Sequence, residues 1–324
     1  MSTDLPFRDH LRNALDLVTT YEEQRAGFLA LAFEKSIRMI PIINDARMLS
    51  QSASSAKVPN DLLLIPSIQH AFLKAAGVSD KAEVFLNKAD IENAKKDLIK
   101  NFLEPSGTDF VDELVYRFLL TQGDALGGIM RNVGGMWGKI KFLDLLRAAL
   151  RNSGFEYEIL IRQSKAWQKN GGSEIPSIEI KAIRWRTNNT FLKPTEFRTL
   201  VLDFTVKIVG KNVDVCLLRG TGEKLSDSYY QEPANYISLG EVKGGIDPAG
   251  ADEHWKTGNT ALQRIRDAFN KRGINPVTFF VGAAIENSMA GEIWNQLNQG
   301  ILSNAANLTK SSHMGALCIW MLKL

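Results

Sequence analysis

The sequence predicts an α/β protein in which a mixed sheet is flanked by helices and preceded by a helical N-terminal region. In the first half of the chain, apolar residues recur at three- and four-residue spacing, the period of a helix with one buried face. After Asn152 the pattern changes to alternation and to short β-branched runs, as in strands. From residue 213 the order strand, strand, helix, strand, helix, strand predicts a mixed sheet with helices on its faces.

The N-terminal half is expected to be a series of helices. Apolar spacing predicts a helix over 11–40, and Pro41 and the serine-rich run 50–55 are expected to interrupt it. Further helices are expected over 61–75, 81–86, 90–102 and 110–122. Ser79 is the expected N-cap of the helix at 81–86.

Glycines are concentrated at 123–135, before helical spacing resumes through Leu150. Their spacing matches neither the phosphate-binding loop GxxxxGK[ST] nor a GxGxxG turn between strand and helix. We therefore interpret them as sites of close helix packing, and an ATP or dinucleotide fold is not expected.

The second half is expected to form the sheet. Strands are predicted at 155–161, 178–185, 199–209, 213–218, 236–243 and 277–285, with a last strand at 315–322. An amphipathic helix containing Leu262 and Ile265 is expected to end at Gly273, and a second helix is expected near 292–297. We place a domain boundary between a helical region, 1–109, and a region 110–324 that carries the sheet and the chemistry.

Composition narrows the class of protein further. The 324 residues are 44% hydrophobic and 23% charged, which is ordinary for a globular chain of about two domains. The net charge of +3 is too small to demand a polyanionic partner, so any DNA-binding surface must gather its positive charge on one face. Cys216 and Cys318 lie in apolar runs and are expected to be buried thiols. With no secretory signal and no membrane-spanning run, we expect a soluble cytoplasmic protein.

The residues that point to chemistry are Asp214, Glu241 and Lys243. Glu241 and Lys243 are two apart near the end of a predicted strand, so their side chains emerge on the same face. If the preceding strand pairs with this one, Asp214 joins them. Two carboxylates beside an ammonium suit Mg²⁺, with Asp214, Glu241 and the Val242 carbonyl as ligands. The ion would lower the pKa of a bound water, and Lys243 would orient that water.

An acid followed by (Asp/Glu)-x-Lys on adjacent strands resembles the PD-(D/E)xK nuclease core. The signal is weak by itself, because Glu179-Ile-Lys181 also matches it on a strand that is expected to face solvent. Three features favour the later match. Its charges interrupt an apolar strand, where an unpaired charge is costly; an acid precedes them on another apolar strand; and a helix and a buried strand follow.

The segment from Gly240 to Thr257, GEVKGGIDPAGADEHWKT, resembles the AvaI/BsoBI restriction endonucleases. Further motifs carry the resemblance over most of the chain: Thr20-Tyr-Glu-Glu, Ala75-Ala-Gly-Val-Ser-Asp-Lys81, Asn101-Phe-Leu-Glu-Pro105, Gln122-Gly-Asp-Ala-Leu-Gly-Gly128, Met130-Arg-Asn132, Lys211-Asn-Val-Asp214, Gly282-Ala-Ala-Ile-Glu286 and Ala306-Asn-Leu-Thr-Lys310. The resemblance is weakest over 151–195.

This resemblance implies a homodimer that encloses duplex DNA, with region 1–109 wrapping the DNA and contributing to dimerisation. It implies Mg²⁺-dependent cleavage at CYCGRG with four-base 5′ overhangs, and a cognate DNA methyltransferase as functional partner. Water would attack in line to leave 5′-phosphate and 3′-hydroxyl ends. The family's acidic pair and lysine fall on Asp214, Glu241 and Lys243, and its active-site histidine falls on His254. Without the family, His254 is a surface residue at a helix start.

The resemblance also implies base contacts by Lys81 and Asp247, at the degenerate Y·R pair. A lysine donor can reach purine N7, which A and G share. Lys211 and Asn212 could reach base edges from the entrance to the strand of Asp214. Each has a simpler alternative: Lys81 as a solvated lysine of a first helical turn, Asp247 before Pro248 as a helix-start turn, and Lys211 with Asn212 as a polar turn.

Two other functions stay open at this point. One is a PD-(D/E)xK nuclease of repair or recombination that recognises DNA structure rather than sequence. The other is a DNA-binding protein without catalysis, although such a protein has no use for two carboxylates that face a phosphate. Metal-dependent cleavage would exclude the inactive protein, and discrete plasmid fragments would exclude the structure-directed nuclease.

Overall fold

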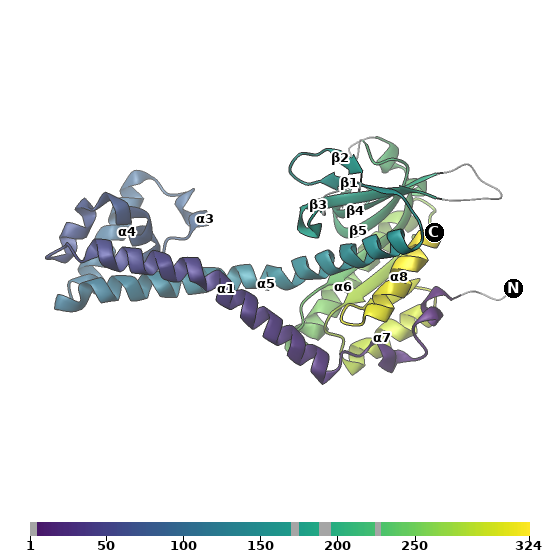
Figure 1. Ribbon diagram of the computed structural model, residues 1–324, viewed down its shortest axis with the longest axis horizontal. Coiled ribbons are helices and arrows are strands. Elements are labelled where there is room, and N and C mark those ends of the chain that lie inside the picture. Colours follow the sequence, from purple (N-terminus) through teal and green to yellow (C-terminus); the bar gives the residue numbers. More distant parts are fainter. Residues whose placement is uncertain (1–4, 170–174, 188–195, 224–227) are drawn as a thin grey trace. The chain divides into compact units, whose positions relative to one another are not determined.

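The computed structural model describes residues 5–169, 175–187, 196–223 and 228–324 (Figure 1). The chain divides into two compact units: a sheet unit of residues 1–28 with 133–324, and a helical unit of residues 29–132. Two long helices, α1 (Tyr21–Ala53) and α5 (Phe110–Asn152), each contribute to both units.

These units differ from the ranges 1–109 and 110–324 expected from the sequence. The turn at 105–109, including the 3₁₀ turn η6 (Gly107–Asp109), connects elements within the helical unit rather than separating two domains. Phe110, Leu114 and Phe118 of α5 lie in one core cluster with Leu98 and Leu103, because α5 presents an apolar face to the preceding helices.

The helical unit contains short helices between the two long ones. They are η3 (Pro59–Leu64), η4 (Pro66–Ile68), α2 (Gln69–Ala75), α3 (Asp80–Glu83), α4 (Lys88–Leu98) and the π turn η5 (Ile99–Leu103). The predicted α-helix over 61–75 is therefore α-helical only from Gln69, because Pro66 lacks an N–H and restricts the residue before it. The predicted cap is confirmed: the Ser79 side chain accepts a hydrogen bond from the Ala82 N–H at 3.2 Å.

The predicted helix over 11–40 is confirmed from Tyr21 onward, but the prediction was wrong for the residues before Tyr21 and for an interruption at Pro41. Two 3₁₀ turns, η1 (Pro6–Asp9) and η2 (Ala14–Leu17), precede α1, which begins at Tyr21 and contains Pro41. A proline removes one helical hydrogen bond and clashes locally. The turns that follow it bury Ala46, Leu49 and Ala53 in the core of the helical unit, and this packing outweighs the local cost.

The glycines at 123–135 lie inside α5, and none of them forms a loop.

The sheet has eight strands in the order β2-β1-β3-β4-β5-β6-β7-β8. Its strands are β1 (Tyr157–Ile161), β2 (Trp167–Lys169), β3 (Ile180–Arg186), β4 (Phe197–Val206), β5 (Lys211–Arg219), β6 (Tyr236–Lys243), β7 (Thr278–Gly282) and β8 (Asn304–Asn307). Strands up to β6 pair antiparallel, whereas β6, β7 and β8 pair in parallel. The expected mixed α/β sheet is therefore confirmed.

Helices cover both faces of this sheet. Helices α6 (Ala251–Asn270) and α7 (Asn287–Asn298) supply the crossovers that parallel strands require. Adjacent residues of β7 point to opposite faces, so Phe280 packs on Trp255 of α6 and Phe279 packs on Trp320 of α8 (Ser311–Lys323). Short 3₁₀ turns complete the unit: η7 (Ser177–Glu179), η8 (Ser228–Gln231), η9 (Pro233–Asn235) and η10 (Pro248–Gly250).

The predicted last strand at 315–322 was wrong, because this segment belongs to α8. A short continuous apolar run has no period that distinguishes a buried strand from a buried helix. In α8 the buried residues include Met314, Leu317, Cys318 and Met321, whose spacing is helical. The eighth strand is instead Asn304-Ala-Ala-Asn307, which is short and has no β-branched residue to reveal it.

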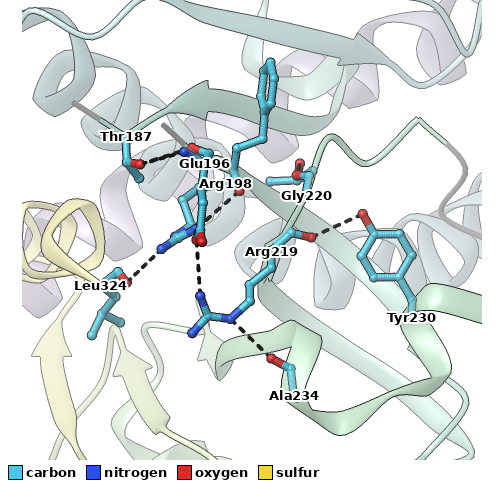
Figure 2. Close-up of polar contacts among 10 residues, drawn as sticks. Thr187, Glu196, Arg198, Arg219, Gly220, Tyr230, Ala234 and Leu324 are labelled. Carbon is cyan, nitrogen blue, oxygen red and sulfur yellow. Dashed lines mark hydrogen bonds and ion pairs between the residues drawn. The ribbon is translucent and has the colours of Figure 1, made fainter. Parts of the chain in front are cut away.

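A polar cluster holds the ends of β4 and β5 that lie away from Asp214 (Figure 2). The Glu196 carboxylate contacts Arg198 at 2.8 Å and Arg219 at 3.3 Å. Arg198 also donates to the carbonyl of the C-terminal Leu324, and Arg219 donates to the carbonyl of Ala234. This cluster therefore ties the strand ends to the C-terminus and to the turn before β6.

Within the described residues, no helix is both long enough and apolar enough to span a membrane.

Candidate active site

Strand pairing brings Asp214 and Glu241 together. In the antiparallel pair of β5 and β6, Val215 stands opposite Gly240, so the register continued by one residue places Asp214 opposite Glu241. The Asp214 Oδ2 atom accepts a hydrogen bond from the Val242 N–H at 3.0 Å. Lys243 Nζ lies 2.8 Å from Glu241 Oε1. The three residues singled out in the sequence therefore form one cluster at the end of the two strands.

The cluster holds a carboxylate that is costly to bury. Glu241 is 8% exposed, in a strand whose other residues are almost all buried. Burial raises the pKa of Glu241, and the nearby charge of Asp214 raises it further, while Lys243 offsets only part of the effect. The negative charge of two acids in such a place favours a bound cation.

The donor set suits a hard divalent cation such as Mg²⁺. Asp214 and Glu241 offer carboxylate oxygens from neighbouring strands, and such oxygens are the protein ligands that Mg²⁺ prefers. Val242 lies between Glu241 and Lys243, and its N–H already positions Asp214. The cluster therefore fits the expected metal centre in both charge and chemistry.

Helix α6 closes over this cluster at a glycine. A Cβ atom on Gly258 would lie 3.4 Å from Lys243 Cε, 3.6 Å from Glu241 Cγ and 2.9 Å from a ring carbon of Phe280. Glycine therefore allows the helix to pass directly against the side chains of Glu241 and Lys243.

His254 lies one turn before Gly258, on the same face of α6. Its Nε2 atom is 2.6 Å from the position a Cβ would take on Gly245 and 3.4 Å from that on Gly250. The ring is thus held against the loop that follows β6. This placement brings the His254 ring against the loop that begins directly after Lys243.

Two residues of this site were missed from the sequence: Lys139 of α5 and Asp203 of β4. Lys139 Nζ donates to Asp214 Oδ1 at 2.7 Å and makes a short contact with Asp203 Oδ1. Burial lowers the pKa of Lys139, but the two carboxylates outweigh burial and raise it. A signal for Asp203 was present, because this acid interrupts an apolar strand as Glu241 does. Lys139 has no such signal, because it lies in a helix beside a second lysine, Lys141, and nothing in the sequence distinguishes the two.

The four expected base-contact residues lie in three places. Lys211 and Asn212 are exposed at the start of β5, just before Asp214. Asp247 is exposed and caps η10 by accepting from the Ala249 N–H at 2.9 Å, which is its alternative role as a helix-start turn. Lys81 is exposed on α3 in the helical unit.

The competing Glu179-Ile-Lys181 motif does not form a second acidic cluster. Glu179 is exposed in η7, whereas the Lys181 ammonium donates to the carbonyls of Leu202 and Asp203 at 2.5 and 2.8 Å. Lys181 is therefore partly buried, rather than solvated as the sequence suggested.

Comparison with known proteins decides the family. The family model described as restriction endonuclease BsobI matches residues 7–324. The chain belongs to this family of restriction endonucleases. It is 47% identical to the type II restriction enzyme BsoBI of Geobacillus stearothermophilus over the full length of both chains. It is also 47% identical to the type II restriction enzymes AvaI of a Nostoc species and of Anabaena variabilis, covering 99% of this chain and 100% of theirs. The suspected resemblance is confirmed, and the protein is an enzyme of the type II restriction endonuclease class.

Proposed function

We propose that the protein cleaves both strands of DNA at CYCGRG in a Mg²⁺-dependent reaction and leaves four-base 5′ overhangs. The observation that carries this proposal is the cluster of Asp214, Glu241 and Lys243 at paired strand ends, in a chain 47% identical to both BsoBI and AvaI. We assign the sheet to the PD-(D/E)xK type on the same arrangement.

In this mechanism Asp214, Glu241 and the Val242 carbonyl hold Mg²⁺. The ion, when bound, stabilises charge on the phosphate and lowers the pKa of the attacking water. Lys243 is held by its 2.8 Å contact with Glu241 and orients that water toward phosphorus. Attack in line with the leaving 3′ oxygen gives 5′-phosphate and 3′-hydroxyl ends.

His254 acts beside Lys243 in this proposal. Packing against Gly245 and Gly250 fixes its ring at the end of the loop after β6. From there, its imidazole accepts a proton from the attacking water or holds a phosphate oxygen by a hydrogen bond.

Sequence is read by a second set of residues in this proposal. Lys211 and Asn212 are exposed beside the catalytic strand and contact base edges in the major groove. Lys81 and Asp247 contact the degenerate Y·R pair, where a donor to purine N7 accepts either A or G. The cap that Asp247 provides is compatible with base contact, because its other carboxylate oxygen is not used by the Ala249 N–H.

A homodimer is the proposed assembly, since two identical sites on a two-fold axis match a palindrome. The supporting surface is a stripe on α1, defined as Leu29, Phe33, Ile37, Ile40 and Ile43, whose side chains are 42% to 70% exposed. Steps of three and four residues place all five on one helix face. Apolar faces of this kind are typical of protein interfaces. In our proposal the N-terminal helices also wrap DNA, and a cognate methyltransferase is the functional partner.

Digestion of a sequenced plasmid by purified protein, with and without Mg²⁺, tests the proposal. We expect discrete fragments that end at CYCGRG only when Mg²⁺ is present. A smear of products would indicate the structure-directed nuclease instead. Tight duplex binding without cleavage would indicate an inactive DNA-binding protein.

Glu241→Gln and Lys243→Ala are the variants for this experiment. Both should abolish cleavage yet retain binding to a CYCGRG duplex, because they remove a metal ligand and a water-orienting group rather than base contacts. Glu253→Gln, an exposed acid on α6, is the control and should cleave normally. Normal turnover by either Glu241→Gln or Lys243→Ala would contradict the mechanism.

A further inference from the structure

Three carboxylates stand in a row across β4, β5 and β6. In the antiparallel pair of β4 and β5, Leu202 stands opposite Val215 and Phe204 opposite Val213. Asp203 therefore stands opposite Asp214, as Asp214 does opposite Glu241 in the next pair. Like charges directly opposite one another in a sheet destabilise it, so this row needs cations.

One of these cations is provided by the protein itself. The Lys139 ammonium lies between Asp203 and Asp214 and contacts an oxygen of each. Its side chain is 20% exposed, and the two carboxylates are 33% and 19% exposed, so water screens these contacts only partly. Arg162 adds a weaker contact at 3.5 Å to the other oxygen of Asp203.

Asp203 is held in a backbone conformation that is costly for a residue with a side chain. Its φ of +50° lies in the left-handed region. The Lys181 ammonium donates to the Asp203 and Leu202 carbonyls and so supports this conformation. Residues kept in such a conformation cluster at functional sites. Asp203 is thus fixed where its carboxylate meets Lys139.

The two sides of Asp214 are therefore different. Toward β4, the space between Asp214 and Asp203 contains the Lys139 ammonium. Toward β6, Asp214 faces Glu241, whose contact with Lys243 uses Oε1. Two-metal nuclease sites need a carboxylate that bridges two ions about 3.5 to 4 Å apart. In this chain the position beside Asp214 that a second ion would take is occupied by the Lys139 ammonium.

We propose that the Lys139 ammonium takes the place of a second divalent cation between Asp203 and Asp214, so that each chain binds one divalent ion, on the Glu241 side. In this arrangement Lys139 is a positioning residue, because its ammonium holds the Asp214 carboxylate. The Asp203 carboxylate in turn holds the Lys139 ammonium. The inference rests on the proposed metal-dependent function, because it assumes that Asp214 and Glu241 hold one ion.

Counting bound Mn²⁺ by electron paramagnetic resonance, on the full chain without DNA, tests this arrangement. The wild-type chain should bind one Mn²⁺. Lys139→Gln should bind two, because it leaves the Asp203 and Asp214 carboxylates facing each other without a cation. The double variant Lys139→Gln with Asp203→Asn should return to one, because it removes the second acid.

Two control variants separate charge from general disturbance. Lys139→Arg keeps a cation and should bind one ion. Lys141→Gln neutralises a lysine two residues along the same helix and should also bind one ion. Circular dichroism on each variant reports whether it is folded.

The possible outcomes distinguish this inference from the proposed function. One ion in both the wild type and Lys139→Gln would overturn the inference alone, as would two ions in the wild type. No ion in the wild type would overturn both the inference and the proposed metal site. If Lys139→Gln does not fold, the wild-type count remains a test, since one ion supports the arrangement and two ions exclude it.

Discussion

The charged residues of the candidate site are paired with one another. Glu241 has Lys243, and Asp203 and Asp214 share Lys139. An ion pair in such surroundings contributes little net stability, because desolvation offsets most of the attraction. The clustering of three acids and two lysines is therefore better explained by the chemistry of the site than by stability.

Two neighbouring histidines, the buried His313 and the half-buried His10, lead to a separate prediction about stability. The rings of His10 and His313 lie 5.1 Å apart, and His10 Nε2 is 2.8 Å from the Ala305 carbonyl oxygen. Burial, together with the nearby charges of His10 and Lys310, lowers the pKa of His313 from 6.5 to about 4, and Asp16 and Glu23 offset only part of this shift. Burial also lowers the pKa of His10.

As the pH falls, His313 of the unfolded chain binds a proton near pH 6.5, whereas His313 of the folded protein stays neutral until about pH 4. The free energy of unfolding should therefore decrease between pH 6.5 and about 4, by at most about 3 kcal/mol from His313. Urea unfolding at a series of pH values measures this slope, and His313→Gln should flatten it. A wild-type slope that the variant reproduces would show that other groups cause it.

At the scale of elements, the packing of α6 on β6 depends on one glycine. In Gly258→Ala the added carbon would lie 2.9 Å from the Phe280 ring and 3.4 Å from Lys243 Cε. We expect a loss of about 1 to 3 kcal/mol in stability from overpacking, together with slower DNA cleavage because Lys243 must move.

Gly291→Ala on α7 is the matched control, because no described atom lies within 4 Å of its added carbon. Alanine should leave stability unchanged or raise it by up to about 1 kcal/mol, as at most helix positions. Thermal unfolding and cleavage rate measure both variants. Equal behaviour of the two alanines would mean that α6 does not press on the site.

Several strands were predicted well, either from alternation or from an apolar run with β-branched residues. The alternation at 155–161 predicted β1, and the apolar run at 236–243 predicted β6 with the bounds observed. The run at 315–322 is apolar throughout, so only its neighbours in the sheet unit decide that it is a helix. The same holds for Pro41, where packing of the later turns of α1 overrides a local helix breaker.

At the scale of the whole molecule, the α1 stripe predicts how the proposed homodimer can be dissociated. Phe33→Glu with Ile40→Glu would place two charges on this stripe, and we expect a dimer to become a monomer in sedimentation velocity. Leu64→Glu, an exposed apolar residue outside the stripe, should leave the dimer intact. A monomeric wild type, or a double variant that stays dimeric, would exclude this surface as the interface.

The sequence by itself determined the mixed α/β class of the molecule and its restriction endonuclease family, and it predicted the candidate catalytic residues. Alternating and apolar runs predicted β1 and the strands from β3 to β7, but they missed the three-residue strand β2. Two charges inside a strand made Glu241 and Lys243 candidates for the site, because burying an unpaired charge is costly. Asp214 was added as a candidate on the expectation that its strand pairs with the strand of Glu241 and Lys243, and β5 and β6 do pair.

Only the tertiary structure decided which residues complete the site. Lys139 is 64 residues from Asp203 and 75 from Asp214 in the sequence, and no local spacing relates them. The three meet because α5 packs beside strands that pair in one particular register. Periodicity reports how a segment buries its own face, whereas contacts between distant segments depend on the register and packing of the whole sheet unit.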